Sequence, residues 1–405
     1  MKITKLQKNI PTGWQEVKLS EISDIKMGQS PLSSAYNGIK KGLPLIQGNN
    51  DIKDKKTVGN IWTTEITKTA EKGELILTVR APVGAIGIAH DKICIGRGVC
   101  AIESKHKPFI WHFLNYFEYK WNTLEQGSTF TAVNSSDIKK IKLLLPLLPE
   151  QNRIVSVLET WDKSIENLNK KIEIKKQIKK GLMQDLLTGK KRLSGFNDKW
   201  ETIKLGDIGE FRTSSVDKKT ISSEKEALLC NYMDVYKRKI IKNTDIFQKI
   251  TAKDSQIESS SLIIGDVLFT PSSETPEDIG YSAVVQSTSP NLLFSYHLVR
   301  FRPKKNTLDA SYSSFCFNQV SFRKYLSSVS AGVTRFTLSK PAFENATVKL
   351  PSIKEQNAIA EILTTADREI TGLEKKLSII KDQKKYLLNN LITGVIRTPE
   401  NLSIK

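Results

Sequence analysis

The stretch PEQNRIVSVLETWDKSIENLNKKIEIKKQIKKGLMQDLLTG at residues 149–189 decides the fold, because the chain carries it twice. The second copy, KEQNAIAEILTTADREITGLEKKLSIIKDQKKYLLNNLITG, lies 205 positions further on, at residues 354–394. Apolar residues in both copies recur in alternating steps of four and three, the heptad pattern of a coiled-coil helix. The seam consists of Ile154, Leu158, Trp161, Ile165 and Leu168 in the first copy and of Ile359, Leu363, Ile370, Leu373 and Leu377 in the second.

Helix-ending signals frame both copies. Pro149 and Pro351 indicate the helix starts, where proline fits without losing a hydrogen bond. Gly189 and Gly394 indicate the ends, where glycine adopts the left-handed conformation. Each helix would have about 35–40 residues and a length of about 55–60 Å. Neither helix can bury its apolar stripe alone, so we expect the two to pair antiparallel about a pseudo-twofold axis. Two ordinary bundle helices inside one globule are the alternative.

Lysines interrupt the seam in both copies. Lys175 and Lys179 stand in the first copy and Lys384 in the second. A polar residue in such a seam costs stability and can fix the register of the pair. The sequence therefore predicts either a register-setting contact or a point at which the helices diverge.

A weaker repeat precedes each helix. Trp14-Gln-Glu-Val-Lys-Leu-Ser-Glu-Ile22 matches Trp200-Glu-Thr-Ile-Lys-Leu-Gly-Asp-Ile208, and Gly73-Glu-Leu-Ile-Leu-Thr78 matches Gly265-Asp-Val-Leu-Phe-Thr270. The offset of the opening match is 186 positions against 205 for the helices, so the second segment is about 19 residues longer. We therefore divide the chain into a mixed domain at 1–148, a helix at 149–192, a second mixed domain at 196–350 and a second helix at 351–397.

Short β-rich runs between turn clusters predict that both mixed domains are α+β. In the first domain we expect strands at 74–80, 85–89, 93–95 and 141–145 and a helix at 108–124. In the second we expect strands at 262–270, 281–286 and 297–301 and a helix at 311–326.

The composition is that of a basic, multi-domain protein. The 405 residues include 62 Lys and Arg against 43 Asp and Glu, a formal charge of +19. Such an excess favours a polyanionic partner, above all nucleic acid. The alternative is that the charge serves only to keep the protein soluble.

Several other classes are excluded. No apolar run approaches the roughly 18–20 residues that span a bilayer, and residues 1–14 lack the apolar core of a signal peptide. The four cysteines and four histidines show no zinc-ligand spacing. We therefore expect a cytoplasmic protein with free thiols, no metal site and no membrane partner.

Polar loops at the ends of the expected strands are the candidate DNA contacts. Arginine can read guanine, and Gln, Ser and Thr can contact bases or phosphates. The same loops are rich in ordinary turn formers, so turn chemistry alone is the alternative. The candidates are Gln29, Ser30, Arg80, Gln126, Ser128, Thr129 and Thr131 in the first domain and Arg212, Ser214, Ser215, Ser272, Thr334 and Arg335 in the second.

The two ordered sets of motifs resemble the specificity (S) subunit of type I restriction-modification enzymes over essentially the whole chain. The matching features are the Trp…Lys-Leu…Ile opening, the strand that ends in Thr, the Glu-Gln-Asn helix start and the Leu…Thr-Gly helix end. The resemblance implies two target-recognition domains, each reading one half of an asymmetric bipartite site in double-stranded DNA.

The resemblance also implies a set of partners. The two helices would fix the gap between the half-sites and dock two methyltransferase (M) subunits, through which up to two nuclease-translocase (R) subunits would join. S-adenosylmethionine, ATP and Mg²⁺ would then belong to the partner subunits, and this chain would need no cofactor.

Motifs for catalysis are absent from the sequence. It contains no Asn/Asp-Pro-Pro-aromatic motif of a DNA methyltransferase, and Leu187-Thr-Gly-Lys-Lys191 lacks the first glycine and the final hydroxyl of a phosphate-binding loop. We therefore expect a recognition subunit without catalytic residues. A stand-alone regulator would instead bind its site tightly without partners, and an enzyme with an unrecognised site would turn over alone.

Overall fold

The computed structural model describes residues 10–125 and 133–402, and the chain forms two compact units. The first unit holds Met1–Asn169 together with Lys375–Lys405, and the second holds Lys170–Glu374. Two long helices, α4 (Leu148–Leu186) and α11 (Ile353–Ile392), each contribute one half to each unit. The compact units therefore differ from the four successive segments expected from the sequence, because each long helix is divided between them.

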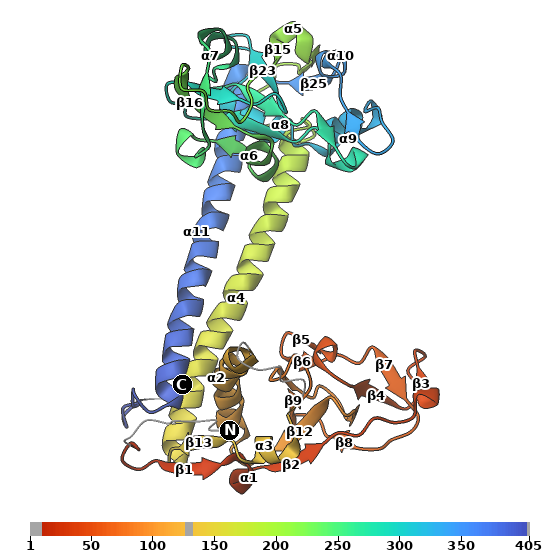
Figure 1. Ribbon diagram of the computed structural model, residues 1–405, viewed down its shortest axis with the longest axis vertical. Helices are drawn as coiled ribbons and strands as arrows, with labels where there is room; N and C mark the ends of the chain where they lie inside the picture. Colours follow the sequence, from red (N-terminus) through yellow and green to blue (C-terminus); the bar gives the residue numbers. More distant parts are fainter. Residues whose placement is uncertain (1–9, 126–132, 403–405) are drawn as a thin grey trace. The chain divides into compact units, whose positions relative to one another are not determined.

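The two long helices run antiparallel within each unit (Figure 1). In the first unit, Ile154 and Leu158 near the start of α4 share a core with Leu391 at the end of α11. In the second, Leu186 at the end of α4 shares a core with Leu363 near the start of α11. The predicted seam is confirmed: Ile154, Leu158, Leu168, Ile359, Leu363 and Ile370 are buried, and Trp161, Ile165, Leu373 and Leu377 are partly buried.

The lysines in the seam form ion pairs across the two helices. Lys179 pairs with Asp367 in the second unit, and Lys384 pairs with Asp162 in the first. Each residue of the first pair lies 205 positions from its counterpart in the other. The interruptions are therefore interhelical contacts that occur once in each unit.

Both predicted glycines end their helices in the left-handed conformation, with φ of 71° at Gly189 and 73° at Gly394. The starts differ from expectation. Pro149 is the second residue of α4, whereas Pro351 precedes α11 by two residues. The residue in register with Pro351 is Pro146, which ends the preceding strand segment in the first unit.

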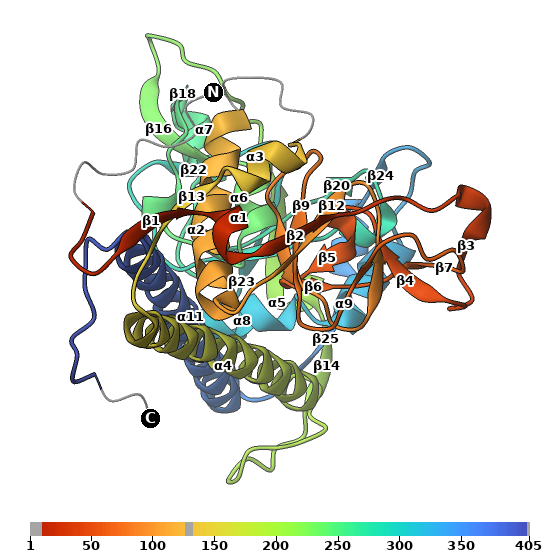
Figure 2. The same cartoon turned by 90° about the horizontal axis from the view of Figure 1, so that it is seen from below.

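The first unit carries a head of short strands and one helix packed on the long helices (Figure 2). Helix α2 (Lys107–Glu125) confirms the expected helix at 108–124, and α1 (Leu19–Ile22) and α3 (Ser135–Lys139) are short. A two-stranded sheet pairs β1 (Gln15–Lys18) with β13 (Lys142–Leu145). A six-stranded sheet has the order β2 (Asp24–Met27), β12 (Val99–Glu103), β9 (Leu75–Thr78), β10 (Ile86–Ile88), β6 (Lys56–Thr57) and β5 (Ile52–Lys53). A five-stranded sheet has the order β3 (Tyr36–Asn37), β7 (Ile61–Thr63), β4 (Leu43–Ile46), β11 (Ile93–Ile95) and β8 (Thr69–Ala70).

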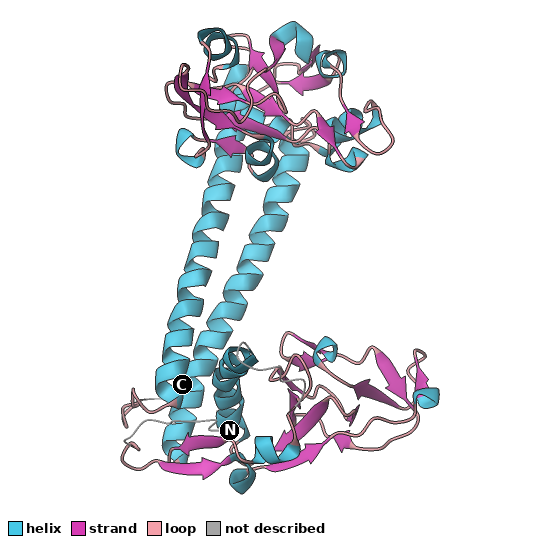
Figure 3. Cartoon of the chain, viewed as in Figure 1, coloured by secondary structure: helices cyan, strands magenta, loops and turns pink. Residues whose placement is uncertain are grey.

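The second unit repeats this plan with its own insertions (Figure 3). The strand pair is β14 (Glu201–Lys204) with β25 (Thr347–Leu350). The main sheet has the order β15 (Gly209–Thr213), β23 (Val299–Pro303), β19 (Val267–Phe269), β21 (Ser282–Val285) and β17 (Ile240–Ile241). Smaller sheets join β18 (Lys249–Ala252), β16 (Lys225–Cys230) and β22 (Leu292–Phe294), and β20 (Ser272–Ser273) with β24 (Phe336–Thr337). The helices are α5 (Leu205–Ile208), α6 (Tyr232–Lys237), α7 (Asp254–Ser260), α8 (Ala310–Cys316), α9 (Val320–Ser328) and α10 (Lys340–Glu344).

Two expected elements of the second unit were wrong in extent. The helix at 311–326 is broken into α8 and α9, because Asn318 turns back and donates to the Ser314 carbonyl of α8 at 2.9 Å. The strand at 262–270 shortens to β19, because the Asp266 carboxylate accepts from the Ile263 amide at 2.9 Å and closes a turn. In both places a side chain replaces the next backbone hydrogen bond of the element.

Candidate nucleic-acid interface

Three loops of the first unit meet at one end of its main sheet. Strand β12 runs antiparallel to both of its neighbours, with Cys100 opposite Met27 of β2 and Val99 opposite Thr78 of β9. The end of β2, the start of β12 and the end of β9 therefore lie together. We call this end of the sheet, with Gln29, Ser30, Arg80 and Arg97, the first loop edge.

Backbone contacts hold the loops of the first loop edge against one another. The Gln29 amide donates to the Ile95 carbonyl at 2.9 Å, and the Arg97 amide donates to the Ser30 hydroxyl at 3.1 Å. Glycine is required beside Arg97, since a Cβ at Gly98 would lie 1.9 Å from the Gln47 carbonyl oxygen. The turn thus presents the exposed Arg97 side chain on a close-packed backbone.

Arg80 belongs to the same edge. The amide of Val79 donates to the Gly98 carbonyl at 2.9 Å, and Arg80 follows it with an exposed side chain. The candidates Gln126, Ser128, Thr129 and Thr131 lie outside the described residues. The amide of Val133, the first described residue after them, donates to the Val79 carbonyl at 2.8 Å.

The second unit builds an equivalent edge from β15, β23 and β19. Val299 of β23 pairs with Thr213 of β15 and with Phe269 of β19. Ser214 and Ser215 therefore lie near the loop that leads from β19 to Ser272. Ser214 is partly buried, and its hydroxyl donates to that of Ser260 at 3.0 Å. We call this end, with the hairpin described next, the second loop edge.

A small hairpin brings the remaining candidates of the second unit together. Strand β24 pairs with β20, with Thr337 opposite Ser272. The exposed Arg335 reaches the Ser272 hydroxyl through Nη2 at 3.4 Å, and Thr334 beside it is exposed. The structure thus joins Ser272, Thr334 and Arg335.

Arg212 lies on the face of the sheet rather than at its end. Its Nε donates to the Glu210 carboxylate at 2.8 Å, two residues earlier in the same strand. On the neighbouring strand β23, the Arg302 guanidinium binds both oxygens of Asp266, each at 2.7 Å. The structure therefore places Arg212 in a charge cluster on this face.

A shared hydroxyl explains the Thr that closes the strand motif in both copies. The Thr78 hydroxyl accepts from the Ala85 amide, and the Thr270 hydroxyl accepts from the Tyr281 amide, both at 2.9 Å. The frame is the same in the two units, and the residue that follows the turn differs. This difference, Ala85 against Tyr281, changes what each loop edge presents.

Sequence reasoning missed several exposed or partly buried side chains at the two edges. They are Arg97 in the first unit and Tyr232, Tyr236, Tyr281, Tyr296, His297 and Arg323 in the second. Arginine and tyrosine interleaved in turn regions were an available signal. Their segments are far apart in the sequence, so only the fold brings them to one edge.

A buried glutamate anchors each head to the long helices. Glu150 near the start of α4 accepts from Trp14 Nε1 at 3.0 Å and from both Nε and Nη2 of Arg397 at 2.7 Å. Burial opposes ionisation of the Glu150 carboxyl, but the hydrogen bonds from Arg397 and Trp14 hold its pKa below the usual 4.5.

The second unit repeats this cluster with equivalent residues. Glu355 accepts from Trp200 Nε1 at 3.1 Å and from Nε and Nη2 of Arg192 at 2.7 and 2.8 Å. Each arginine follows the end of one long helix and each glutamate lies at the start of the other. The Trp and Glu of the repeated motifs are therefore structural anchors between a head and the helices.

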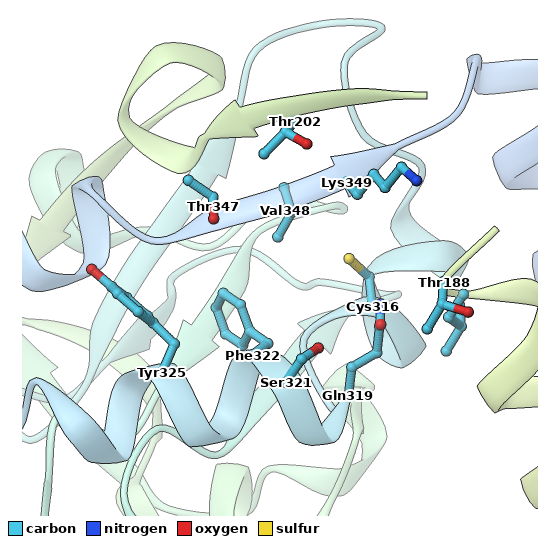
Figure 4. A pocket seen from close by; sticks show the side chains of 11 residues that line it. Thr188, Thr202, Cys316, Gln319, Ser321, Phe322, Tyr325, Thr347, Val348 and Lys349 are labelled. Carbon is cyan, nitrogen blue, oxygen red and sulfur yellow. The ribbon is translucent and has the colours of Figure 1, made fainter. Parts of the chain in front are cut away.

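A pocket of about 330 Å³ lies between α9 and the β14–β25 pair (Figure 4). The Cys316 thiol points into it, and burial raises the pKa of this thiol to about 12, so it is protonated and unreactive at neutral pH. The described residues that line the pocket include no histidine or carboxylate. The pocket therefore offers no acid–base pair to support a catalytic site.

Two further searches covered the part of the chain that the structure describes. In residues 10–125 and 133–402, no group of three or more His, Cys, Asp or Glu side chains is placed to hold a metal ion. Among the same residues, no helix has both the length and the apolar character needed to cross a membrane.

Comparison with known proteins agrees with the repeat. The family described as "Type I restriction modification DNA specificity domain" matches this chain twice, at residues 11–176 and 197–381. The type I restriction enzyme MjaVIII specificity subunit of Methanocaldococcus jannaschii is 24% identical, with 96% of this chain and 94% of that protein covered. The putative MjaX specificity subunit of the same organism is 36% identical, but the match spans only 45% of either chain.

A solved structure shares the fold. A chain from a study of complex assembly and conformational transition in the type I R-M system superposes with a TM-score of 0.63 at 17% identity, over 96% of this chain and all of that one. With two copies of the domain covering most of the sequence, the chain belongs to the family of type I restriction-modification DNA specificity subunits.

Proposed function

We propose that this chain is the non-catalytic DNA-reading subunit of a type I complex, in which each head reads one half of an asymmetric bipartite site. The observation that supports this most directly is the pair of loop edges, which share one backbone frame and differ in side chains. A common frame with different side chains suits two readers of different sequences. The half-site contacts in the first head would come from Arg80, Arg97, Gln29 and Ser30.

The long helices would set the gap between the half-sites. A helix of 39 residues is about 58 Å long, and a rigid spacer of fixed length converts directly into a fixed spacing on DNA. Ion pairs across the seam in each unit support a rigid pair. Two methyltransferase subunits would dock on the duplicated helical segments, and nuclease-translocase subunits would join through them.

Catalysis and its cofactors would then belong to the partners. S-adenosylmethionine, ATP and Mg²⁺ would be bound by the methyltransferase and nuclease-translocase subunits, and the complex would act in the cytoplasm. The low reactivity of the buried Cys316 and the lack of a catalytic motif in the sequence support a recognition role.

Methylation mapping by long-read sequencing tests this proposal. A host that carries the chain with its methyltransferase partner should methylate a single asymmetric site made of two separated half-sites. A variant with Arg80→Ala and Arg97→Ala should relax or abolish reading of one half-site only, since both arginines belong to the first head. Lys105→Ala, exposed beyond the opposite end of β12, is the matched control and should leave the site unchanged. Loss of both half-sites in the well-folded arginine variant would refute the division of labour.

A further inference from the structure

Three tyrosines and an arginine form a continuous stack at the second loop edge. Tyr232 and Tyr236 of α6 stack with ring centres 5.9 Å apart, and Tyr236 meets Tyr281 edge-on at 4.7 Å. The guanidinium of Arg323 on α9 lies 3.8 Å from the centre of the Tyr281 ring. All four side chains are partly buried, so the stack borders the solvent.

Hydrogen bonds tie this stack to the predicted DNA contacts. The Tyr281 amide donates to the Thr270 hydroxyl at 2.9 Å, at the end of β19. The Tyr232 hydroxyl donates to the Ser272 carbonyl at 3.0 Å, and Ser272 is the residue that Arg335 reaches. The stack and the hairpin therefore belong to one surface.

Arg323 is held in place but not neutralised. Its Nη2 donates to the Glu277 carbonyl at 2.6 Å, and the Tyr281 ring fixes the plane of the guanidinium. It makes no ion pair with any residue in the described part of the chain. An arginine fixed by stacking loses little conformational freedom when its remaining donors bind a ligand.

The stack is specific to the second head. At the frame position of Tyr281, the first unit has Ala85, which offers no ring for an arginine. A residue that only maintained the shared frame would be expected in both copies. A residue that reads a base would differ between heads with different half-sites.

We propose that Arg323, positioned by Tyr281, reads a guanine in the half-site of the second head. This inference rests on the proposed function, in which that head contacts DNA. The planar fork of a guanidinium can donate to both O6 and N7 of guanine in the major groove, a pattern that no other base presents. The ring of Tyr281 holds the fork in the orientation that this contact needs.

Methylation mapping of the full chain with its methyltransferase partner tests the inference with three variants. Arg323→Ala should reduce discrimination at one guanine of the second half-site by about 10- to 100-fold, and leave the first half-site unchanged. Arg323→Lys should lose the same discrimination, because it keeps the charge but not the fork. Lys324→Ala, exposed on the same helix, should leave the base preference intact.

The outcomes separate this inference from the function beneath it. If the wild-type site is bipartite but its second half lacks guanine, the reading by Arg323 is refuted and the proposed function stands. If Arg323→Lys behaves as wild type while Arg323→Ala weakens methylation of every sequence alike, the residue contacts phosphate and the inference is again refuted. If no bipartite site is methylated, the proposed function itself fails. Thermal unfolding of each variant confirms that the fold is intact.

Discussion

At the scale of single residues, the buried glutamates Glu150 and Glu355 explain the Glu of the repeated helix-start motif. Each carboxylate is almost fully buried and satisfies a tryptophan N–H and an arginine fork at once. A buried carboxylate is tolerated only when its oxygens are paired in this way. The three groups come from a head, the start of one helix and the segment after the other, so one residue joins three segments.

His112 is a second buried polar residue, and it sets a pH dependence. It lies on α2, its Nε2 is buried with no partner among the described residues, and it faces Asp162 and Lys384 of the long helices. Burial lowers the pKa of His112 from 6.5 to about 4; Asp162 opposes this and Lys384 adds to it. In the second unit, Phe315 lies against Lys179 at 5.5 Å, so an aromatic ring without a charge fits a comparable place.

We therefore expect the protein to lose stability on acidification. Because the folded-state pKa of His112 is lowered, its neutral form stabilises the fold above pH 6.5, and this contribution is lost between pH 6.5 and 4. The loss would reach about 3 kcal/mol. Urea unfolding across this range should show the decline, and His112→Phe should reduce it. His90→Gln, an exposed control, should not alter it. An equal decline in wild type and His112→Phe would contradict the assignment to His112.

At the scale of elements, each unit holds its halves of α4 and α11 together through one apolar seam and one seam-lysine ion pair. The side chain of Lys179 is only 13% exposed, so its pairing with Asp367 is shielded from water more than a surface pair. The nearby Lys176–Glu374 pair has side chains 49% and 47% exposed. Shielding makes the charge pattern of the first pair matter for register, because an unpaired charge there would be costly.

A charge-reversal cycle tests this role. Lys179→Glu should lower the free energy of unfolding by about 1–3 kcal/mol, since it places two carboxylates together in a shielded seam. Adding Asp367→Lys should restore part of the loss. The same reversal at Lys176 and Glu374 is the matched control and should change stability by about 0.5 kcal/mol or less. Urea denaturation gives all the values; a cycle at Lys179 no larger than that of the control would argue against a register-setting pair.

At the scale of the whole molecule, the chain is two units built on one plan, and its last described segment returns to the first unit. Arg397 binds Glu150 and also donates to the Thr12 carbonyl at 3.0 Å, so residues near both ends of the chain serve one anchor. The +19 charge belongs to this scale as well. It acts on any DNA, whereas base choice depends on the loop edges.

DNA binding by the assembled complex should therefore depend steeply on salt. If about six phosphates are contacted, raising the salt from about 50 to 200 mM should weaken binding of a duplex by about 10³-fold, through loss of counterion release. Fluorescence anisotropy with a labelled duplex measures this slope. A duplex without the recognised site should show weaker binding with a similarly steep dependence. An affinity independent of salt would mean that the charge plays no part in DNA binding.

The sequence by itself determined the helices, their seam, the repeat and the family resemblance, because heptads, capping glycines and duplicated motifs are local patterns. Helix α2 could be predicted for the same reason, whereas the break between α8 and α9 depends on where the Asn318 side chain turns.

Only the tertiary structure decided which side chains share a loop edge. Arg323 and Tyr281 are 42 positions apart, and sheet pairing and helix packing bring them together. It also decided that Arg192 pairs with Glu355 and Arg397 with Glu150, and that Arg212 lies on a sheet face with Glu210. These outcomes follow from strand register and antiparallel packing, which join segments that no local pattern connects.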